Sequence, residues 1–306
     1  MRVTAIVGLL LVILLVALSS YLRLDHSGIG CTPWPDCYGN IGEQRVATLD
    51  GAYERLISEA REPMSWARPM HRLVASILGL LVLGLTATSV VQKRDRALSF
   101  TLLGLTVFLA WLGIYSEGLH SPAIVMGNLC GGFAMLGIFG RLAFNSGDNL
   151  LNCRHWVTAA IAMLCLQIII GGLTSANFAA GACTTLPHCN GSWLPGAELL
   201  NAVDLTRAHE IDSNGFVIVG AEGVAIHQLH RIFAVFVVAV ILTAAIMAMR
   251  EERRYLATAI FVCFVVLAEL SVGVAAVKTN IPIGAAVAHN WLAGLLLLGL
   301  LRLNTK

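Results

Sequence analysis

The sequence contains eight apolar runs, and each is long enough to cross a lipid bilayer as a single helix. A spanning helix needs about 20 predominantly apolar residues. The predicted spans are residues 3–22, 71–92, 98–116, 122–143, 156–176, 226–249, 256–276 and 282–302. Only 12% of the residues are charged, whereas a soluble domain carries about 25%. The sequence therefore predicts an all-α integral membrane protein with eight transmembrane helices.

Lysine and arginine residues gather in the short connections on one side of the predicted spans. They are Lys93, Arg94, Arg96, Arg141, Arg154, Arg250, Arg253, Arg254, Arg302 and Lys306. Cytoplasmic loops of membrane proteins carry such an excess, so we predict that this side and both termini are cytoplasmic. The long loops 23–70 and 177–225 then lie on the outer side, and no basic block indicates nucleic-acid binding.

The two halves of the chain share a short pattern in their long outer loops. Residues 31–37 and residues 183–189 both read Cys-Thr-x-x-Pro-x-Cys. A histidine–arginine pair follows each segment near the start of the next apolar run, beginning at His71 and at His230. Such a repeat predicts two four-helix bundles related by an axis along the membrane normal.

The repeat divides the chain into residues 1–150 and residues 151–306, and the second part holds two histidines at compatible depths. His230 begins the sixth span, and His289 lies roughly 12 Å inside the eighth span at 1.5 Å per residue. A histidine inside a membrane is costly unless it has a partner. Two imidazoles approaching from opposite sides suit a six-coordinate heme iron, whereas a zinc site takes more protein ligands. We therefore predict that His230 and His289 bind heme iron.

Other polar residues lie beside these histidines. Arg72 and Arg231 follow the two repeated histidines at the interface, where a guanidinium suits a planar carboxylate. Arg231 is predicted to bind a heme propionate, with Arg72 in the corresponding place. His227 shares a helix face with His230, and its place at the helix mouth favours a propionate contact or an interfacial role.

The first half lacks a second histidine. His71 corresponds to His230, but Asn128 and Leu129 occupy the region that corresponds to His289, and neither is a good ligand for heme iron. Three alternatives are open for this half: it binds a heme weakly, it uses His71 as a single ligand, or it holds no heme.

Both outer loops contain a cysteine pair that predicts a disulfide. Cys31 with Cys37, and Cys183 with Cys189, each enclose a short proline-containing segment on the oxidising side, where disulfides persist. A membrane thiol–disulfide exchange protein is the alternative. A reactive pair is more often Cys-x-x-Cys, so the structural disulfide is favoured.

Taken together, these motifs resemble the heme A synthase family, in its bacterial form with one cysteine pair in each outer loop. The matching residues are Gly30-Cys31, Trp34-Pro35, Cys37, Gly39, Met70-His71-Arg72, Ala182-Cys183, Pro187, Cys189, His230-Arg231 and Ala288-His289. The resemblance covers nearly the whole chain. It implies a protein of the bacterial inner membrane that oxidises the C8 methyl of heme O to the formyl of heme A for terminal oxidases. The implied partners are heme O, heme A, heme O synthase, terminal oxidase subunits and membrane lipid.

The resemblance also implies roles for single residues. Heme b is expected between His230 and His289, and the substrate heme is expected beside His71. In the substrate half, the second histidine of the family falls on Leu129, and an expected acidic residue falls on Arg68, which cannot act as an ordinary base. We predict a divergent heme A synthase, with a non-catalytic, heme-b-binding assembly protein and a thiol–disulfide exchange protein as the alternatives.

Overall fold

The computed structural model describes residues 2–26, 66–115, 122–144, 152–210, 212–213 and 217–304. Eight long helices make up most of this part of the chain, which contains no β-strand. They are α1 (Arg2–His26), α3 (Ala67–Gln92), α4 (Arg96–Tyr115), α5 (Pro122–Phe144), α6 (Arg154–Ala176), α8 (Ala221–Glu251), α9 (Leu256–Lys278) and α10 (Ile283–Asn304). The short elements are η1 (Ala179–Gly181), α7 (Leu199–Ala202) and η2 (Arg253–Tyr255). The eight long helices are long and apolar enough to cross a membrane, which confirms the predicted fold class.

Helix α8 begins farther out than the apolar run predicts. The sequence places the start of this span at residue 226, but the helix begins at Ala221, directly after the extended Gly220. Glu222 in the first turn accepts a hydrogen bond from the Gly220 N–H at 3.2 Å and pairs with Arg207 at 3.0 Å. A carboxylate is stabilising at a helix N-terminus because the macrodipole is positive there. His230 therefore lies more than two turns inside the helix, and not near its mouth.

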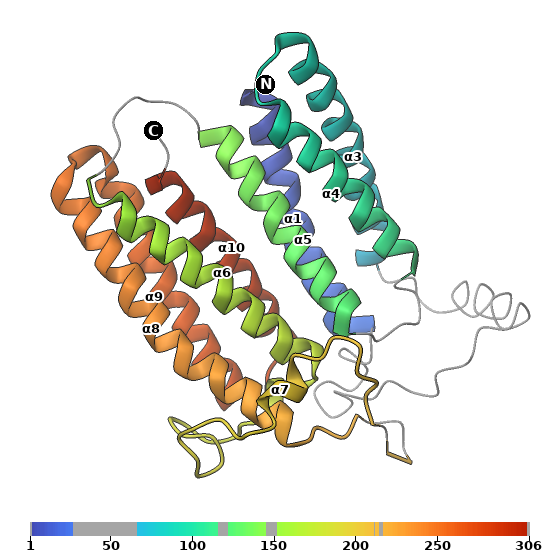
Figure 1. Ribbon diagram of the computed structural model, residues 1–306, viewed down its shortest axis with the longest axis vertical. Helices are drawn as coiled ribbons and strands as arrows, with labels where there is room; N and C mark the ends of the chain where they lie inside the picture. The colour runs from blue at the N-terminus through green and yellow to red at the C-terminus, as the bar shows by residue number, and fades with distance from the viewer. Residues whose placement is uncertain are drawn as a thin grey trace, which may run out of the picture.

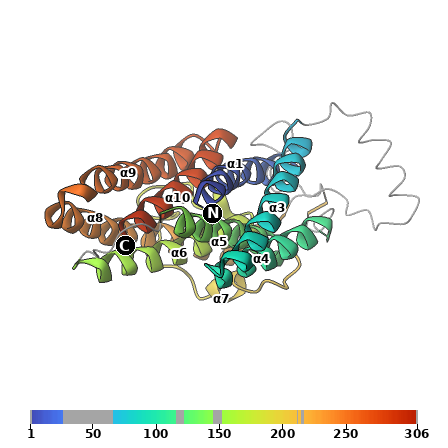
Figure 2. The same cartoon turned by 90° about the horizontal axis from the view of Figure 1, so that it is seen from above.

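The long helices pack in two groups of four that lie side by side (Figures 1 and 2). Helices α1, α3, α4 and α5 form one group, in which each helix contacts two neighbours, and α6, α8, α9 and α10 form the other in the same order. The groups meet where α10 contacts α1 and α5, and where α5 contacts α6. In each group two helices lie diagonally opposite: α3 and α5 in the first, α8 and α10 in the second. A sequence repeat between the halves and a domain boundary near residue 150 stay predictions.

Glycines allow the helices to approach closely, both within the first group and between the groups. A Cβ added at Gly8 of α1 would overlap the Phe139 ring of α5, and one added at Gly172 of α6 would lie 2.8 Å from Leu129 Cδ2 of α5. Association of helices in lipid depends on such close packing, because lipid tails are as apolar as the side chains. The two groups are therefore held together by fitted apolar surfaces.

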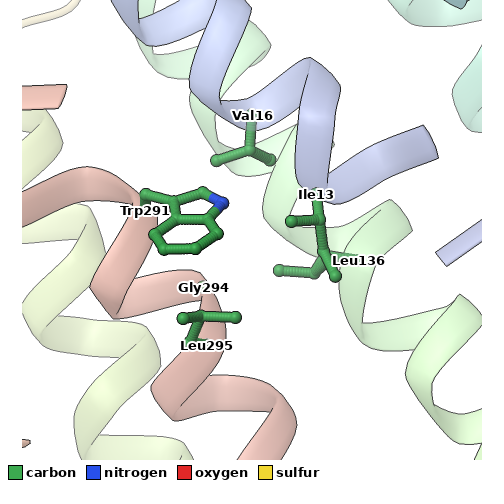
Figure 3. A pocket seen from close by; sticks show the side chains of 6 residues that line it. All are labelled: Ile13, Val16, Leu136, Trp291, Gly294 and Leu295. Carbon is green, nitrogen blue, oxygen red and sulfur yellow. The ribbon is translucent and has the colours of Figure 1, made fainter. Parts of the chain in front are cut away.

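A small apolar crevice lies where α1, α5 and α10 meet (Figure 3). Its lining residues are Ile13, Val16, Leu136, Trp291, Gly294 and Leu295. It has no space for a water-sized sphere, so it is a packing irregularity at the interface and not a ligand site. Next to it, the Asn290 side chain of α10 donates a hydrogen bond to Ser20 Oγ of α1 at 2.8 Å, which fixes the two groups against each other.

A disulfide closes the loop that follows α6. Cys183 and Cys189 are bonded to each other, which confirms one of the two predicted disulfides. The backbones of Cys189 and Ser192 exchange two hydrogen bonds of 3.0 and 2.9 Å just beyond it. Cys31 and Cys37, the other predicted pair, lie outside the described residues.

A paired-histidine site between the C-terminal helices

His230 and His289 lie beside each other inside the second helix group. They come from the diagonally opposed helices α8 and α10, and their ring centroids are 6.2 Å apart with the ring planes at 82°. These are the two residues that the sequence selected as a ligand pair. Their proximity depends on the packing of helices that are separated in the chain by α9.

The Nδ1 atom of His230 lies against a glutamine of the neighbouring helix. Gln167 on α6 places its Nε2 atom 3.1 Å from His230 Nδ1 and 3.0 Å from the His230 carbonyl oxygen. The other amide atom, Oε1, is buried without a hydrogen-bond partner among the described residues. Because Nδ1 faces this amide, the Nε2 atom of the His230 ring lies on the side away from Gln167.

The Nδ1 atom of His289 lies against a carboxylate of its own neighbouring helix. Glu269 on α9 places Oε1 3.2 Å from His289 Nδ1. The alignment does not meet hydrogen-bond criteria, and Glu269 Oε2 is likewise buried without a partner in the described part of the chain. The Glu269 carboxylate and the His289 ring are therefore close to each other but are not hydrogen-bonded in this structure.

Two glycines make space for the imidazole rings. A Cβ at Gly171 of α6 would lie 2.9 Å from His230 Cε1, and a Cβ at Gly273 of α9 would lie 3.1 Å from His289 Cε1. Such distances are shorter than ordinary van der Waals contacts, so a larger residue at either position would force the ring to move. Each ring thus lies in a hollow that the glycine backbone leaves open.

The geometry of the site fits a metal held between two imidazoles. A metal–imidazole bond is about 2 Å long, and each ring centre lies roughly 1 Å farther, so rings on opposite sides of one metal have centres roughly 6 Å apart. The observed separation of 6.2 Å agrees with this value. The His289 side chain is 35% exposed although helices surround it, so protein atoms do not fill the space beside it.

The donor set favours heme iron over a metal held by protein alone. No group of three or more His, Cys, Asp or Glu side chains suited to a metal ion occurs in the described ranges. A structural zinc site takes four protein ligands and a catalytic one takes three. Two imidazoles 6.2 Å apart suit a heme, whose porphyrin supplies the other four nitrogens.

Arg231 contacts the disulfide loop in this structure, and its predicted propionate contact stays a prediction. Its guanidinium donates to the carbonyl oxygens of Cys183 and Thr185 at 2.5 and 2.7 Å, and its Nε–H donates to His227 Nε2 at 3.1 Å. Gln228 of the same helix donates to the Ser192 carbonyl at 2.8 Å. Arg231 thus fastens the disulfide loop to α8, and His227 is buried beneath this contact and not at an open helix mouth. The sequence does not reveal these partners, because they lie 36 to 48 residues upstream in an irregular loop.

Among its described side chains, the first helix group has no comparable histidine pair. His71 lies near the beginning of α3, where it is partly buried, and the side chain of Arg68 lies outside the described residues. Leu129 does not project into its own group, since it packs against Gly172 of α6. At 3.6 residues per turn, Asn128 lies about 20° around α5 from Phe139, the residue that meets α1. Asn128, rather than Leu129, is therefore on the inner face of α5.

Gln167 and Glu269 are the site residues that the sequence prediction missed. A signal for Glu269 was present, because it is the only acidic residue more than two residues from an end in the eight long helices. An ionisable residue within a membrane span is costly and usually functional. Gln167 has no comparable signal, because a single amide in an apolar helix is compatible with simple packing.

The fold and the site define an integral membrane protein with a pair of histidines, inside a helix group, that is suited to heme. Residues 2–301 match the family model described as cytochrome oxidase assembly protein, COX15-CtaA, and the chain belongs to this family. The heme A synthase of Shewanella oneidensis is 29% identical over 97% of this chain and 94% of its own length. That of Neorickettsia sennetsu is 26% identical over 95% of this chain and 94% of its own. That of Allorhizobium ampelinum is 26% identical over 93% and 84%.

Proposed function

We propose that the chain is a heme A synthase, which oxidises the C8 methyl group of heme O to the formyl group of heme A for terminal oxidase biogenesis. Membership of the cytochrome oxidase assembly family supports this proposal, as does the name heme A synthase of its relatives. The observation that carries it is the His230–His289 pair, with centroids 6.2 Å apart in the middle of a helix group.

The C-terminal helices are the proposed site of a heme b cofactor. When bound, heme b supplies one-electron transfer. His230 and His289 would hold the iron through their Nε2 atoms, since each Nδ1 atom faces Gln167 or Glu269. Because His230 and His289 would leave no coordination position for another ligand, this half would transfer electrons and would not bind oxygen.

The N-terminal helices are the proposed site of the substrate heme. His71 on α3 would be its single protein ligand, and Arg72 beside it is suited to a propionate. The arrangement of the helices supports this site. Helix α3 lies diagonally opposite α5, just as α8 lies diagonally opposite α10 in the group that holds the histidine pair. The inner face of α5 offers Asn128 in place of a second histidine.

The second candidate function is a heme-b-binding protein that assists oxidase assembly without oxidising heme. The observation in its favour is the first helix group itself, where Leu129 packs against α6 and His71 has no histidine opposite it among the described residues. In this case the C-terminal pair would still bind heme b.

Thiol–disulfide exchange receives less support from the described loop. Exchange requires access of an attacking thiolate to a sulfur atom, but Cys183 and Cys189 are each 1% exposed. Cys153 is also unsuited, since burial and the nearby Glu251 carboxylate raise the pKa of its thiol to about 11. The disulfide is better suited to hold the loop that Arg231 binds.

We also propose a bacterial inner membrane location with both termini in the cytoplasm. The two ends of the described chain lie at the same end of the helix groups, opposite α7 (Figure 1), and the basic connections lie at that end. Heme O synthase and terminal oxidase subunits are the proposed protein partners, because they precede and follow this reaction.

Extraction of the bound pigment tests the proposed function. The protein is purified after expression with and without a source of heme O, and its hemes are separated by chromatography. Heme A, or the alcohol on the way to it, is expected only when heme O is present. Heme B alone in both preparations would support the assembly protein.

A further inference from the structure

The two histidines are supported by the same arrangement from two different helices. On α6, Gln167 faces the His230 ring and Gly171, four residues later, accommodates it. On α9, Glu269 faces the His289 ring and Gly273, again four residues later, accommodates it. Residues four apart lie on the same helix face. Each supporting helix therefore presents one polar side chain and one hollow to one imidazole.

The two supporting side chains differ in charge and in hydrogen-bonding capacity. A carboxylate only accepts hydrogen bonds, so Glu269 is matched to a His289 ring that carries its proton on Nδ1. The amide of Gln167 can present either its nitrogen or its oxygen, and it presents Nε2 to both Nδ1 and the carbonyl of His230. Only the carboxylate therefore fixes one tautomer of its ring.

An imidazole that binds iron through Nε2 must carry its proton on Nδ1. For His289, Glu269 Oε1 lies 3.2 Å from Nδ1 and can accept this proton after a small adjustment of the contact. For His230, the Gln167 amide must turn by half a rotation so that Oε1 replaces Nε2. That rotation gives the orphaned Oε1 atom a partner, but it removes the hydrogen bond to the His230 carbonyl.

Resting on the proposed heme b site, we infer that Glu269 and Gln167 are positioning residues that make the two heme ligands unequal. His289, against a carboxylate, is the more strongly electron-donating ligand, and His230, against a neutral amide, is the weaker one. Hydrogen bonds from a ligating histidine to a carboxylate raise the basicity of the ligand. A negative charge beside the iron also favours the more positive ferric state. Glu269 thus lowers the midpoint potential of the bound heme.

Exchanging the two side chains tests this inference in the full-length, heme-loaded protein. Midpoint potentials are measured by redox titration of the visible spectrum, and the ferric state is examined by electron paramagnetic resonance. Glu269→Gln is expected to raise the potential and Gln167→Glu to lower it. The double exchange, with one carboxylate and one amide, is expected to return the potential close to that of the wild type.

The outcomes separate this inference from the proposed function. If His230→Ala and His289→Ala retain the low-spin heme, the heme site itself is wrong. If those variants lose heme while Glu269→Gln and Gln167→Glu both leave the potential unchanged, the heme site stands and the inference is overturned. Should Glu269→Gln fail to retain heme, Gln167→Glu decides alone, because it adds a carboxylate without removing one.

Discussion

The two helix groups share one order of contacts but differ in the residues on their inner faces. In the C-terminal group, α8 and α10 present His230 and His289 to each other. In the N-terminal group, α3 presents His71, and the opposing face of α5 presents Asn128. A polar residue and a glycine support each C-terminal histidine. Under the proposed function, the C-terminal group would hold its heme between two histidines, and the N-terminal group would bind its heme through His71 alone.

This difference between the groups predicts that removing either histidine of the C-terminal pair has the largest effect on the heme spectrum. His230→Ala or His289→Ala should abolish the low-spin heme spectrum, because the iron loses one of its two axial imidazoles, while the protein still inserts into the membrane. Visible spectra of purified variants, with the amount of membrane-inserted protein as the control, provide the measurement. An unchanged low-spin spectrum in both variants would reject the ligand assignment.

Filling the space beside an imidazole ring should reduce heme binding nearly as much as removing a ligand. Gly171→Ala places a Cβ 2.9 Å from His230 Cε1, so the ring must shift, and overpacking of this kind costs about 1–3 kcal/mol. We expect a reduced ratio of heme to protein. Gly104→Ala is the matched control, because it also lies within a long helix, α4, and its added Cβ has no neighbour within 4 Å. Equal heme content in the two variants would contradict the proposed role of the hollow.

A second histidine can be introduced into the N-terminal group, so that it resembles the C-terminal group. Asn128→His places an imidazole on the inner face of α5, so it should convert the heme held by His71 to a low-spin form. Leu129→His should not, because position 129 faces Gly172 of the other group, and it should lower stability instead. Spectra of both variants after loading with heme decide between the two positions. A low-spin conversion by Leu129→His alone would restore the alignment that the family resemblance implies.

The smallest effect on the heme spectrum is expected at Arg231. Removing a hydrogen bond of a charged group costs about 1.5–3 kcal/mol, and Arg231→Gln weakens the contacts to Cys183 and Thr185. We expect a lower melting temperature and faster proteolysis of the disulfide loop, with the low-spin heme spectrum retained. Gln228→Ala, which loses only the contact to Ser192, should have a milder effect. Loss of heme without loss of stability would support a propionate contact.

The fold and the histidine pair could be predicted from the sequence because their signals are strong. Apolar runs of sufficient length define the spans, and a histidine in such a run needs a partner. The sequence could not predict which side of α5 faces the inside of its group. Asn128 and Leu129 lie in an apolar run, and the residues around them do not indicate which of the two points inward. The contacts of Arg231 with the carbonyls of Cys183 and Thr185 were not predictable either, because those carbonyls belong to a loop whose path depends on tertiary packing.

The binding of carbon monoxide most directly tests the claim that the two groups differ. Iron with two imidazoles excludes small ligands, whereas iron with one protein ligand binds them. In reduced protein loaded with both hemes, carbon monoxide should shift only part of the spectrum. His71→Ala should abolish that part and leave the low-spin part intact. A single heme per chain with no response to carbon monoxide would mean that the N-terminal group is empty, and the synthase would give way to the assembly protein.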